Sequence, residues 1–316
     1  MPGTPEPPAS HAVDLDGPVR YAEWAGPAGR TFVLVHGLGG SRVNWALVAP
    51  GLARHGRVLA LDLPGFGRSP LAGRDPGLAS LRATLSAFLR EVAGGRAVVC
   101  GNSMGGTLAI LQGALEPETV EGLVLTCPAL PVSRAAVPSP VALGSFTLYR
   151  VPVVGEFVVS QRFARVPPET QIRLGFRILA GDPRAIGEEV VRAHAEVLRE
   201  HARDPDAARA FVGAARSLLQ LLWRPRAYRH LMARVRAPVL LLHGGRDPLV
   251  PVAYARRAAV ENPSWRLRVF PDLGHIPQLE DPGRWLASVE AWLADALSVP
   301  APASATTPGP APTLAP

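Results

Sequence analysis

Short apolar segments rich in β-branched residues recur along the chain and are separated by longer amphipathic segments. The short segments predict strands at 19–24, 31–36, 57–62, 96–101, 122–127, 238–243 and 266–270. Apolar positions at helical spacing predict helices at 45–54, 78–93, 104–115, 254–260 and 283–297. Because strands alternate with helices, the pattern predicts an α/β fold with a mostly parallel sheet covered by helices on both faces.

This alternation stops for about a hundred residues in the second half of the chain. An apolar stretch interrupted by proline and glycine at 141–160 is followed by helical patterns near 185–203 and 206–223. The strand pattern resumes at residue 238. We therefore expect residues 128–236 to form a helical cap over the carboxyl edge of the sheet, between two core segments at 15–127 and 237–297. Residues 1–14 and 298–316 are expected to be disordered, because segments rich in proline and alanine bury too little surface to become ordered.

The strand expected at 96–101 leads directly into the sequence Gly101-Asn102-Ser103-Met104-Gly105-Gly106, which is followed by a predicted helix. A strand that turns straight into a helix forces its central residue into a strained conformation. Glycine two positions to either side leaves room for that turn. Ser103 is therefore the candidate nucleophile, although a glycine-rich turn without chemistry would give the same pattern.

A serine hydroxyl needs a neighbouring base, and the base needs an acid to fix its tautomer. His275 lies in a loop after the last predicted strand, where the loop can meet Ser103 at the carboxyl edge of the sheet. Asp247 follows the preceding strand and projects from the same edge, while the loop 128–134 contains no carboxylate. We therefore expect Ser103, His275 and Asp247 to act together, with Glu280 or Asp272 as the alternative acids.

An oxyanion intermediate needs backbone N–H groups directed at the developing charge. We expect one from Met104 and another from Leu38, with Gly39 as the alternative for the second. The substrate pocket is expected to be apolar, although each lining residue could simply pack the cap onto the core. Its expected members are Gly39, Asn44, Asn102, Phe146, Phe157, Trp223 and Ile276.

The composition changes this picture little. With 316 residues, 47% of them hydrophobic, the chain can bury a large core. Its formal net charge is +7, but the basic residues are scattered arginines, so we expect no nucleic-acid partner. Cys100 and Cys127 end apolar runs and are expected to be reduced core thiols, with no disulfide and no metal site.

The first residues of the chain and its most apolar stretch do not predict export or membrane insertion. The first ten residues contain no basic region followed by an apolar region, so we expect a cytoplasmic location. The apolar stretch 141–160 includes Arg150, Pro152 and Glu156, which argue against an integral membrane segment.

Four motifs in one order resemble the α/β-hydrolase superfamily over about residues 15–297. They are HGLG at 36–39, DLPGFGRS at 62–69, GNSMGG at 101–106, and GRD at 245–247 with GH at 274–275. The resemblance implies an eight-stranded sheet with a helical cap between strands six and seven. It also implies that the loop 62–69 is structural, and that catalysis proceeds without a cofactor or metal.

Within that superfamily, serine at position 103 argues against epoxide hydrolases and haloalkane dehalogenases, which use aspartate there. The segment 101–106 with Asn44 resembles the meta-cleavage-product hydrolases, but Ile276 stands where those enzymes usually have tryptophan. The chain is therefore more similar to the esterase and lipase-like group, and we expect it to hydrolyse a hydrophobic small-molecule carboxylic ester. A carbon–carbon bond hydrolase, a perhydrolase-like activity and a non-catalytic binding protein remain the alternatives.

Overall fold

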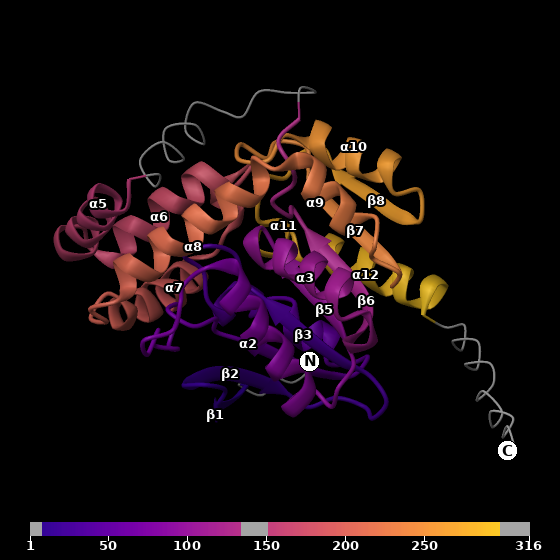
Figure 1. Cartoon of the computed structure of the whole chain (residues 1–316), viewed down its shortest axis with the longest axis horizontal. Helices are drawn as coiled ribbons and strands as arrows, with labels where there is room; N and C mark the ends of the chain where they lie inside the picture. The colour runs from indigo at the N-terminus through magenta and orange to yellow at the C-terminus, as the bar shows by residue number, and fades with distance from the viewer. Residues whose placement is uncertain (1–7, 134–150, 298–316) are drawn as a thin grey trace, which may run out of the picture.

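The computed structural model describes residues 8–133 and 151–297, which form one eight-stranded sheet with helices on both faces (Figure 1). The spatial order of the strands is β1-β2-β4-β3-β5-β6-β7-β8. Only the pairs β1–β2 and β2–β4 are antiparallel, so the predicted fold class is confirmed. The strands are β1 (Ala9–Asp14), β2 (Pro18–Trp24), β3 (Thr31–Val35), β4 (Arg57–Leu61), β5 (Ala97–Asn102), β6 (Val120–Thr126), β7 (Val239–Gly244) and β8 (Trp265–Phe270).

The helices around the sheet are mostly those that the sequence predicts. Residues 45–54 are an exception, because η1 and α1 replace a single helix there. Pro50 can stand only in the first turn of a helix, so a helix cannot run through it from residue 45. The helices outside the insertion are η1 (Arg42–Trp45), α1 (Ala49–Leu52), α2 (Leu78–Glu91), α3 (Met104–Leu115), η2 (Pro117–Thr119), α10 (Val252–Glu261), α11 (Pro277–Glu280) and α12 (Pro282–Ala296).

Alternate residues of the central strands supply two separate cores, as the two-residue period of a strand requires. Val33 and Val35 of β3 pack in the core that contains α2, α3 and α10. Phe32 and Leu34 of the same strand pack in the core that contains α1 and α12. The sheet is therefore buried on both faces, which leaves the ends of its strands as the place for a site.

The amino-terminal segment differs from the sequence-based expectation. Residues 9–14 form β1, which pairs in antiparallel register with β2 from Ala9 opposite Glu23 to Asp14 opposite Pro18. The side chains of β1 are exposed or half-buried, so an argument from apolar burial could not detect this strand. Its order comes from backbone pairing with β2. The expected disorder of residues 1–7 and 298–316 lies outside the described residues.

Helices between β6 and β7 form the part of the chain that we call the helical insertion, residues 152–232. They are α5 (Pro152–Arg165), α6 (Pro168–Leu179), η3 (Pro183–Ala185), α7 (Glu188–His201), α8 (Ala207–Leu222) and α9 (Pro225–Met232). Figure 1 shows α5, α6, α7 and α8 gathered beside one end of the core. None of the helices in residues 8–133 and 151–297 combines the length and apolarity that a membrane span needs.

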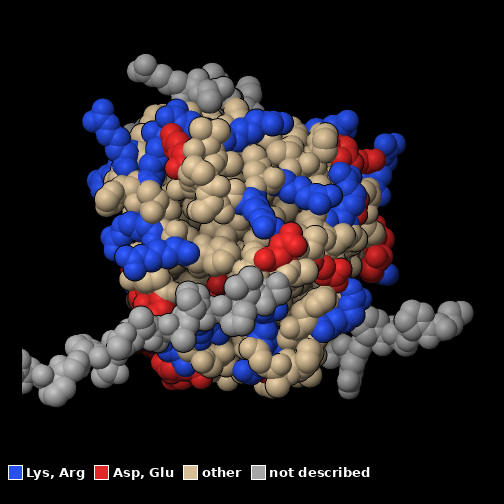
Figure 2. All heavy atoms as spheres, turned by 90° about the vertical axis from the view of Figure 1, so that its right-hand side faces the viewer, with Lys and Arg blue, Asp and Glu red and all other residues tan. Residues whose placement is uncertain are grey.

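Charged side chains are mixed rather than segregated on the face that Figure 2 presents. Exposed ion pairs such as Arg266–Asp295 and Arg284–Asp272 place arginine beside a carboxylate. Such mixing gives this face no continuous positive field of the kind that attracts nucleic acid.

Candidate active site

Ser103 stands on the sharp turn between β5 and α3. Its backbone has φ 54° and ψ −116°, a left-handed conformation that is rare for a residue with a side chain. The turn is tight because a Cβ atom on Gly101 would overlap the carbonyl of Gly105. A Cβ atom on Gly105 would in turn overlap the carbonyl oxygens of Val35 and His36. The two glycines therefore allow α3 to start directly against the end of β3, with Ser103 at the tip of the turn.

His275 and Asp247 come from the loops after β8 and β7, and both side chains are buried. His275 Nδ1 donates to Asp247 Oδ2 over 2.7 Å. The other carboxylate oxygen, Oδ1, accepts from the N–H groups of Leu249 at 2.8 Å and Val250 at 2.9 Å. Desolvation opposes ionisation of Asp247, yet the neighbouring His275 and these donors hold the pKa of the carboxyl below its usual value. An ionised Asp247 fixes the tautomer in which Nε2 of His275 is free to accept a proton.

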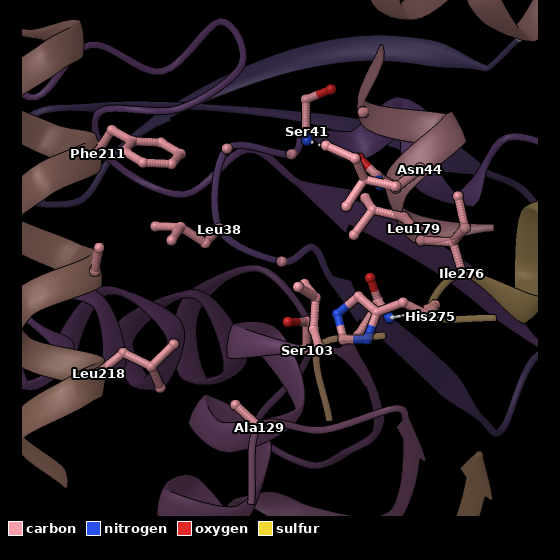
Figure 3. Close-up of a pocket in the computed structure, with 18 of the residues that line it drawn as sticks. Leu38, Ser41, Asn44, Ser103, Ala129, Leu179, Phe211, Leu218, His275 and Ile276 are labelled. Atoms are coloured by element: carbon pink, nitrogen blue, oxygen red, sulfur yellow. Dashed lines mark hydrogen bonds between the residues drawn. The ribbon is translucent and has the colours of Figure 1, made fainter. Parts of the chain in front are cut away.

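Ser103 and His275 line the same cavity, and Figure 3 shows the serine side chain beside the imidazole. Among the described residues, the Ser103 hydroxyl forms no hydrogen bond with that ring. Hydrogen bonds between catalytic groups are often long in the absence of substrate and shorten when substrate binds. The arrangement thus supplies a nucleophile, a base and an oriented acid around one cavity.

The two alternative acids have other partners. Glu280 accepts from the N–H groups of Gly181 at 2.7 Å and Gly274 at 2.9 Å, so it braces the loop that carries His275. Asp272 is exposed and pairs with Arg284 at 2.8 Å. Asp247 is therefore the carboxylate that reaches His275.

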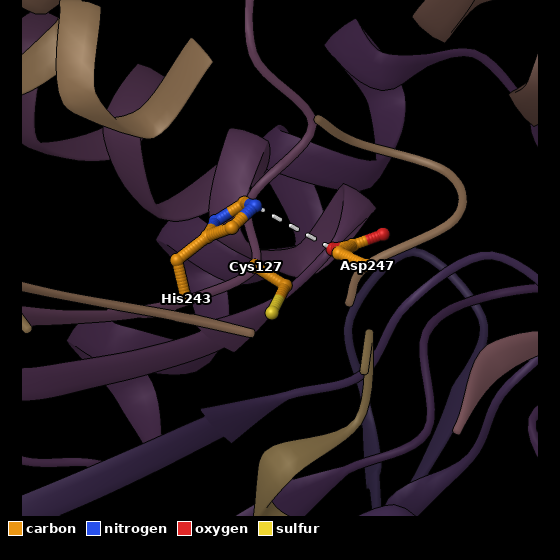
Figure 4. Close-up of side chains that lie close together, drawn as sticks. All are labelled: Cys127, His243 and Asp247. Atoms are coloured by element: carbon orange, nitrogen blue, oxygen red, sulfur yellow. Dashed lines mark ion pairs between the residues drawn. The ribbon is translucent and has the colours of Figure 1, made fainter. Parts of the chain in front are cut away.

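The side chains of Cys127, His243 and Asp247 lie close together (Figure 4). His243 Nε2 donates to the carbonyl of Val250 at 2.9 Å and lies 3.6 Å from Asp247 Oδ2, so this nitrogen keeps its proton. Burial, and then the charge of Asp247, raise the pKa of the Cys127 thiol well above its ordinary value. A protonated nitrogen and a neutral thiol are poor ligands, so the donor set does not fit a metal ion.

The two N–H groups expected to face an oxyanion lie in adjacent positions of the fold. Met104 is the first residue of α3, where the helix offers its N–H no internal partner. In the described part of the chain, the N–H of Leu38 makes no backbone hydrogen bond, and Leu38 lines the cavity. Both N–H groups are thus free to bind a substrate oxygen.

The loop that carries Leu38 is braced by the segment 62–69. His36 Nε2 accepts from Leu63 N at 3.0 Å, while its Nδ1 donates to Gly37 O at 2.8 Å. Burial lowers the pKa of His36, which suits this neutral tautomer. Asp62 accepts from the N–H groups of Arg42 at 2.7 Å and Arg68 at 3.0 Å. These bonds agree with the structural role that the resemblance implies for this segment.

The cavity above Ser103 has a volume of about 370 Å³. Of the residues expected in the pocket, Gly39, Asn44, Asn102 and Ile276 line it. The side chain of Asn102 is buried, and its Nδ2 donates hydrogen bonds to Thr126 O at 3.0 Å and His275 O at 3.2 Å. Its role is therefore to hold the loop of His275.

Two expected pocket residues point elsewhere, and one cannot be placed. Phe157 is 62% exposed on α5 and Trp223 is 59% exposed at the end of α8, and neither lines the cavity. Trp223 follows Leu222 of the buried face, so it is turned by about 100° around the helix axis. Phe157 precedes the lining residue Val159 by two positions and is turned by about 200°. Phe146 lies outside the described residues.

The sequence analysis missed the lining that α5, α6 and α7 provide. Val159 and Phe163 of α5 and Ile172 and Phe176 of α6 face the cavity, as do Arg162, Gln171, His194 and His201. The apolar pairs are spaced by four residues, which is a helical signal. Glycine and proline in 141–160 obscured it.

Comparisons with known proteins identify a family whose sequence model matches this chain and several related proteins. Residues 32–289 match the sequence model described as the Alpha/beta hydrolase family. The chain is 33% identical over 255 residues to a pimeloyl-[acyl-carrier protein] methyl ester esterase of Aromatoleum aromaticum, covering 79% of this chain and 92% of that one. It is 28% identical over 276 residues to the dihydrolipoyllysine-residue acetyltransferase component of the acetoin cleaving system of Pseudomonas putida, covering 86% of this chain but only 66% of that protein.

A solved structure resembles the fold at lower identity. The meta-cleavage product hydrolase from Pseudomonas fluorescens IP01 has a TM-score of 0.67 and 22% identity, with 88% of this chain and 95% of that chain covered. At this identity the likeness concerns the fold alone.

We predict that Gly105→Ala lowers the free energy of unfolding by about 2 kcal/mol or more, because the added methyl group overlaps two carbonyl oxygens. Urea unfolding followed by circular dichroism measures the change. Gly175→Ala on α6 is the matched control: a Cβ atom there meets nothing within 4 Å, so helix propensity should leave stability unchanged or raise it by up to about 1 kcal/mol. Equal midpoints for Gly105→Ala and the wild type would show that this close approach does not constrain the fold.

Proposed function

The chain belongs to the α/β hydrolase family, and from this premise we propose that it is a serine hydrolase that cleaves carboxylic esters of hydrophobic acids. One observation carries the proposal. Ser103 stands on a strained turn at the edge of an apolar cavity, beside His275, whose Nδ1 is bonded to a buried carboxylate. This is the combination that turns an unreactive hydroxyl into a nucleophile.

In the proposed reaction, His275 Nε2 takes the proton of Ser103 as the Oγ atom attacks the ester carbonyl carbon. Asp247 stabilises the imidazolium that results. The N–H groups of Leu249 and Val250, which donate to the other carboxylate oxygen, keep Asp247 in place. The carbonyl oxygen becomes negatively charged and is bound by the N–H groups of Met104 and Leu38.

The tetrahedral intermediate then collapses. The bond to the alcohol oxygen breaks as His275 returns the proton to that oxygen, which leaves an acyl group on Ser103. Water enters, gives a proton to His275 and attacks the acyl carbon. The second collapse releases the acid and restores the serine hydroxyl.

The cavity lining supports a hydrophobic acyl group as the substrate. Leu130, Phe163, Phe211, Leu218 and Leu222 contribute apolar surface around the opening above Ser103. The methyl ester esterase among the relatives is consistent with ester chemistry. A chain of methylene groups would bury its surface against these side chains.

Ser103→Ala should abolish ester hydrolysis with a loss on the order of 10⁶ in rate, since no covalent intermediate can form. Turnover of p-nitrophenyl butyrate measures the loss, and circular dichroism checks the fold. A fluorophosphonate probe should label the wild type on the peptide that contains Ser103 and leave the alanine variant unlabelled. Labelling of another serine, or a variant with a tenth of wild-type turnover, would contradict the assignment.

Asp247→Asn should lower kcat about 10⁴-fold, less than the loss of the nucleophile, because the amide favours the wrong tautomer of His275 but leaves Ser103 in place. Asp272→Asn is the matched control, since Asp272 is exposed and bonded to Arg284. Its kcat should equal that of the wild type. Wild-type kcat in Asp247→Asn would mean that another group orients the histidine.

The cavity should select esters by acyl length. Each methylene buried against the lining contributes up to about 0.8 kcal/mol, so kcat/KM should rise from acetyl to hexanoyl p-nitrophenyl esters before the cavity is filled. Steady-state kinetics across that series measures the slope. A flat or falling profile would reject an apolar acyl pocket and favour a polar substrate or carbon–carbon bond cleavage.

A further inference from the structure

One charged side chain interrupts the apolar lining. Among the described residues that line the cavity, Arg162 of α5 is the only one with a permanent charge. Three histidines share the lining: His275, which lies beside Ser103, and His194 and His201, which are neutral near pH 7. Burial lowers the pKa of His194 to about 4 and lowers that of His201 as well. Away from Ser103 and His275, an anion in the cavity would therefore meet its positive partner at Arg162.

A buried amide holds this arginine in place. Arg162 Nε donates to Gln171 Oε1 at 2.8 Å. Gln171 is 3% exposed, and its Nε2 donates to the carbonyls of Arg162 at 3.1 Å and Val166 at 2.8 Å. The glutamine thus bonds to the side chain and to the backbone of the same arginine. Fixing Nε fixes the plane of the guanidinium, because that group is rigid.

Several other arginines of the helical insertion have carboxylate partners, although not all of them do. Arg173 pairs with Glu188, and Arg199 pairs with Glu169. In residues 8–133 and 151–297, no carboxylate lies within ion-pair distance of Arg162, and its two terminal nitrogens donate no hydrogen bond. A guanidinium that is fixed, unpaired and next to apolar walls is preorganised to bind a planar anion through its two terminal nitrogens.

We propose that Arg162 binds a carboxylate carried by the substrate's acyl chain at the end remote from the scissile ester. The inference rests on the proposed ester hydrolysis and narrows its substrate class to half-esters of dicarboxylic acids. In this arrangement the apolar lining holds the methylene chain, Ser103 attacks the ester carbonyl, and Arg162 binds the far carboxylate. Arg162 is an exposed residue, so solvent screens the ion pair and its contribution is moderate.

The test compares two ester series with equal chain lengths. One series consists of mono-p-nitrophenyl esters of dicarboxylic acids from adipate to sebacate, and the other of p-nitrophenyl esters of the corresponding fatty acids. The measured quantity is the ratio of kcat/KM for the charged ester to that for the neutral ester at each length. In the wild type this ratio should peak at the length that spans Ser103 and Arg162.

Arg162→Gln should lower the peak ratio by about twofold to fivefold, the range expected for an exposed ion pair. Arg165→Gln removes the same charge from the same helix at a position outside the lining, so its ratio should match the wild type. Added salt should lower the wild-type ratio and leave that of Arg162→Gln unchanged, because only the former contains the ion pair. A ratio in Arg162→Gln equal to that in Arg165→Gln at every length would overturn the proposal.

A failure of the proposed function would be visible separately, as the absence of turnover for both series in the wild type. In that case, binding affinities test the role of Arg162. Isothermal titration of the Ser103→Ala protein with monomethyl suberate and with methyl octanoate should give tighter binding of the half-ester, and Arg162→Gln in that background should remove the difference. Equal affinities for the two esters in the Ser103→Ala protein would overturn the role of Arg162.

Discussion

The site depends on one close backbone contact, where the first turn of α3 lies against the end of β3. Glycine at position 105 lets the helix approach the carbonyl oxygens of Val35 and His36 without a side chain between them. The contact places the N–H of Met104 and the loop of Leu38 on the same side of Ser103. Ser103 and these two backbone N–H groups are therefore positioned by the centre of the sheet, so the proposed reaction would require little rearrangement when charge develops on the substrate.

The base is held in a different way, by interactions from three parts of the chain. Asn102 binds the carbonyl of His275, Leu179 at the end of α6 accepts from its N–H, and Glu280 binds the N–H groups of Gly274 and Gly181. Two of these contacts connect the His275 loop to the helical insertion. The insertion thus helps to hold the loop of His275 as well as lining the cavity.

The sequence predicted those features of the fold that depend on local sequence patterns. The seven strands of 19–270 are all present with their ends displaced by at most two residues, and the turn around Ser103 follows from its two glycines. Strand β1 escaped prediction because its order comes from pairing with β2. Phe157 was placed in the pocket as part of an apolar stretch and Trp223 as part of an apolar set at helical spacing, whereas both side chains are exposed and directed outward. Arg162 carried no sequence signal, because its significance depends on which residues surround it in space.

In the proposed reaction, chemistry and substrate selection come from separate parts of the fold. Ser103, Asp247 and His275, the groups proposed to act on the reacting atoms, follow the core strands β5, β7 and β8, whereas most of the apolar lining and Arg162 belong to the insertion. β5 and β7 are paired on both sides and β8, at the edge of the sheet, is paired with β7, so these strands can hold the groups that follow them within the narrow limits that catalysis needs. The insertion contacts only the remote part of a substrate, where one methylene or one charge changes binding by a moderate factor. For the proposed ester hydrolysis, replacement of its residues would therefore change which ester is preferred while the chemistry at Ser103 stays the same.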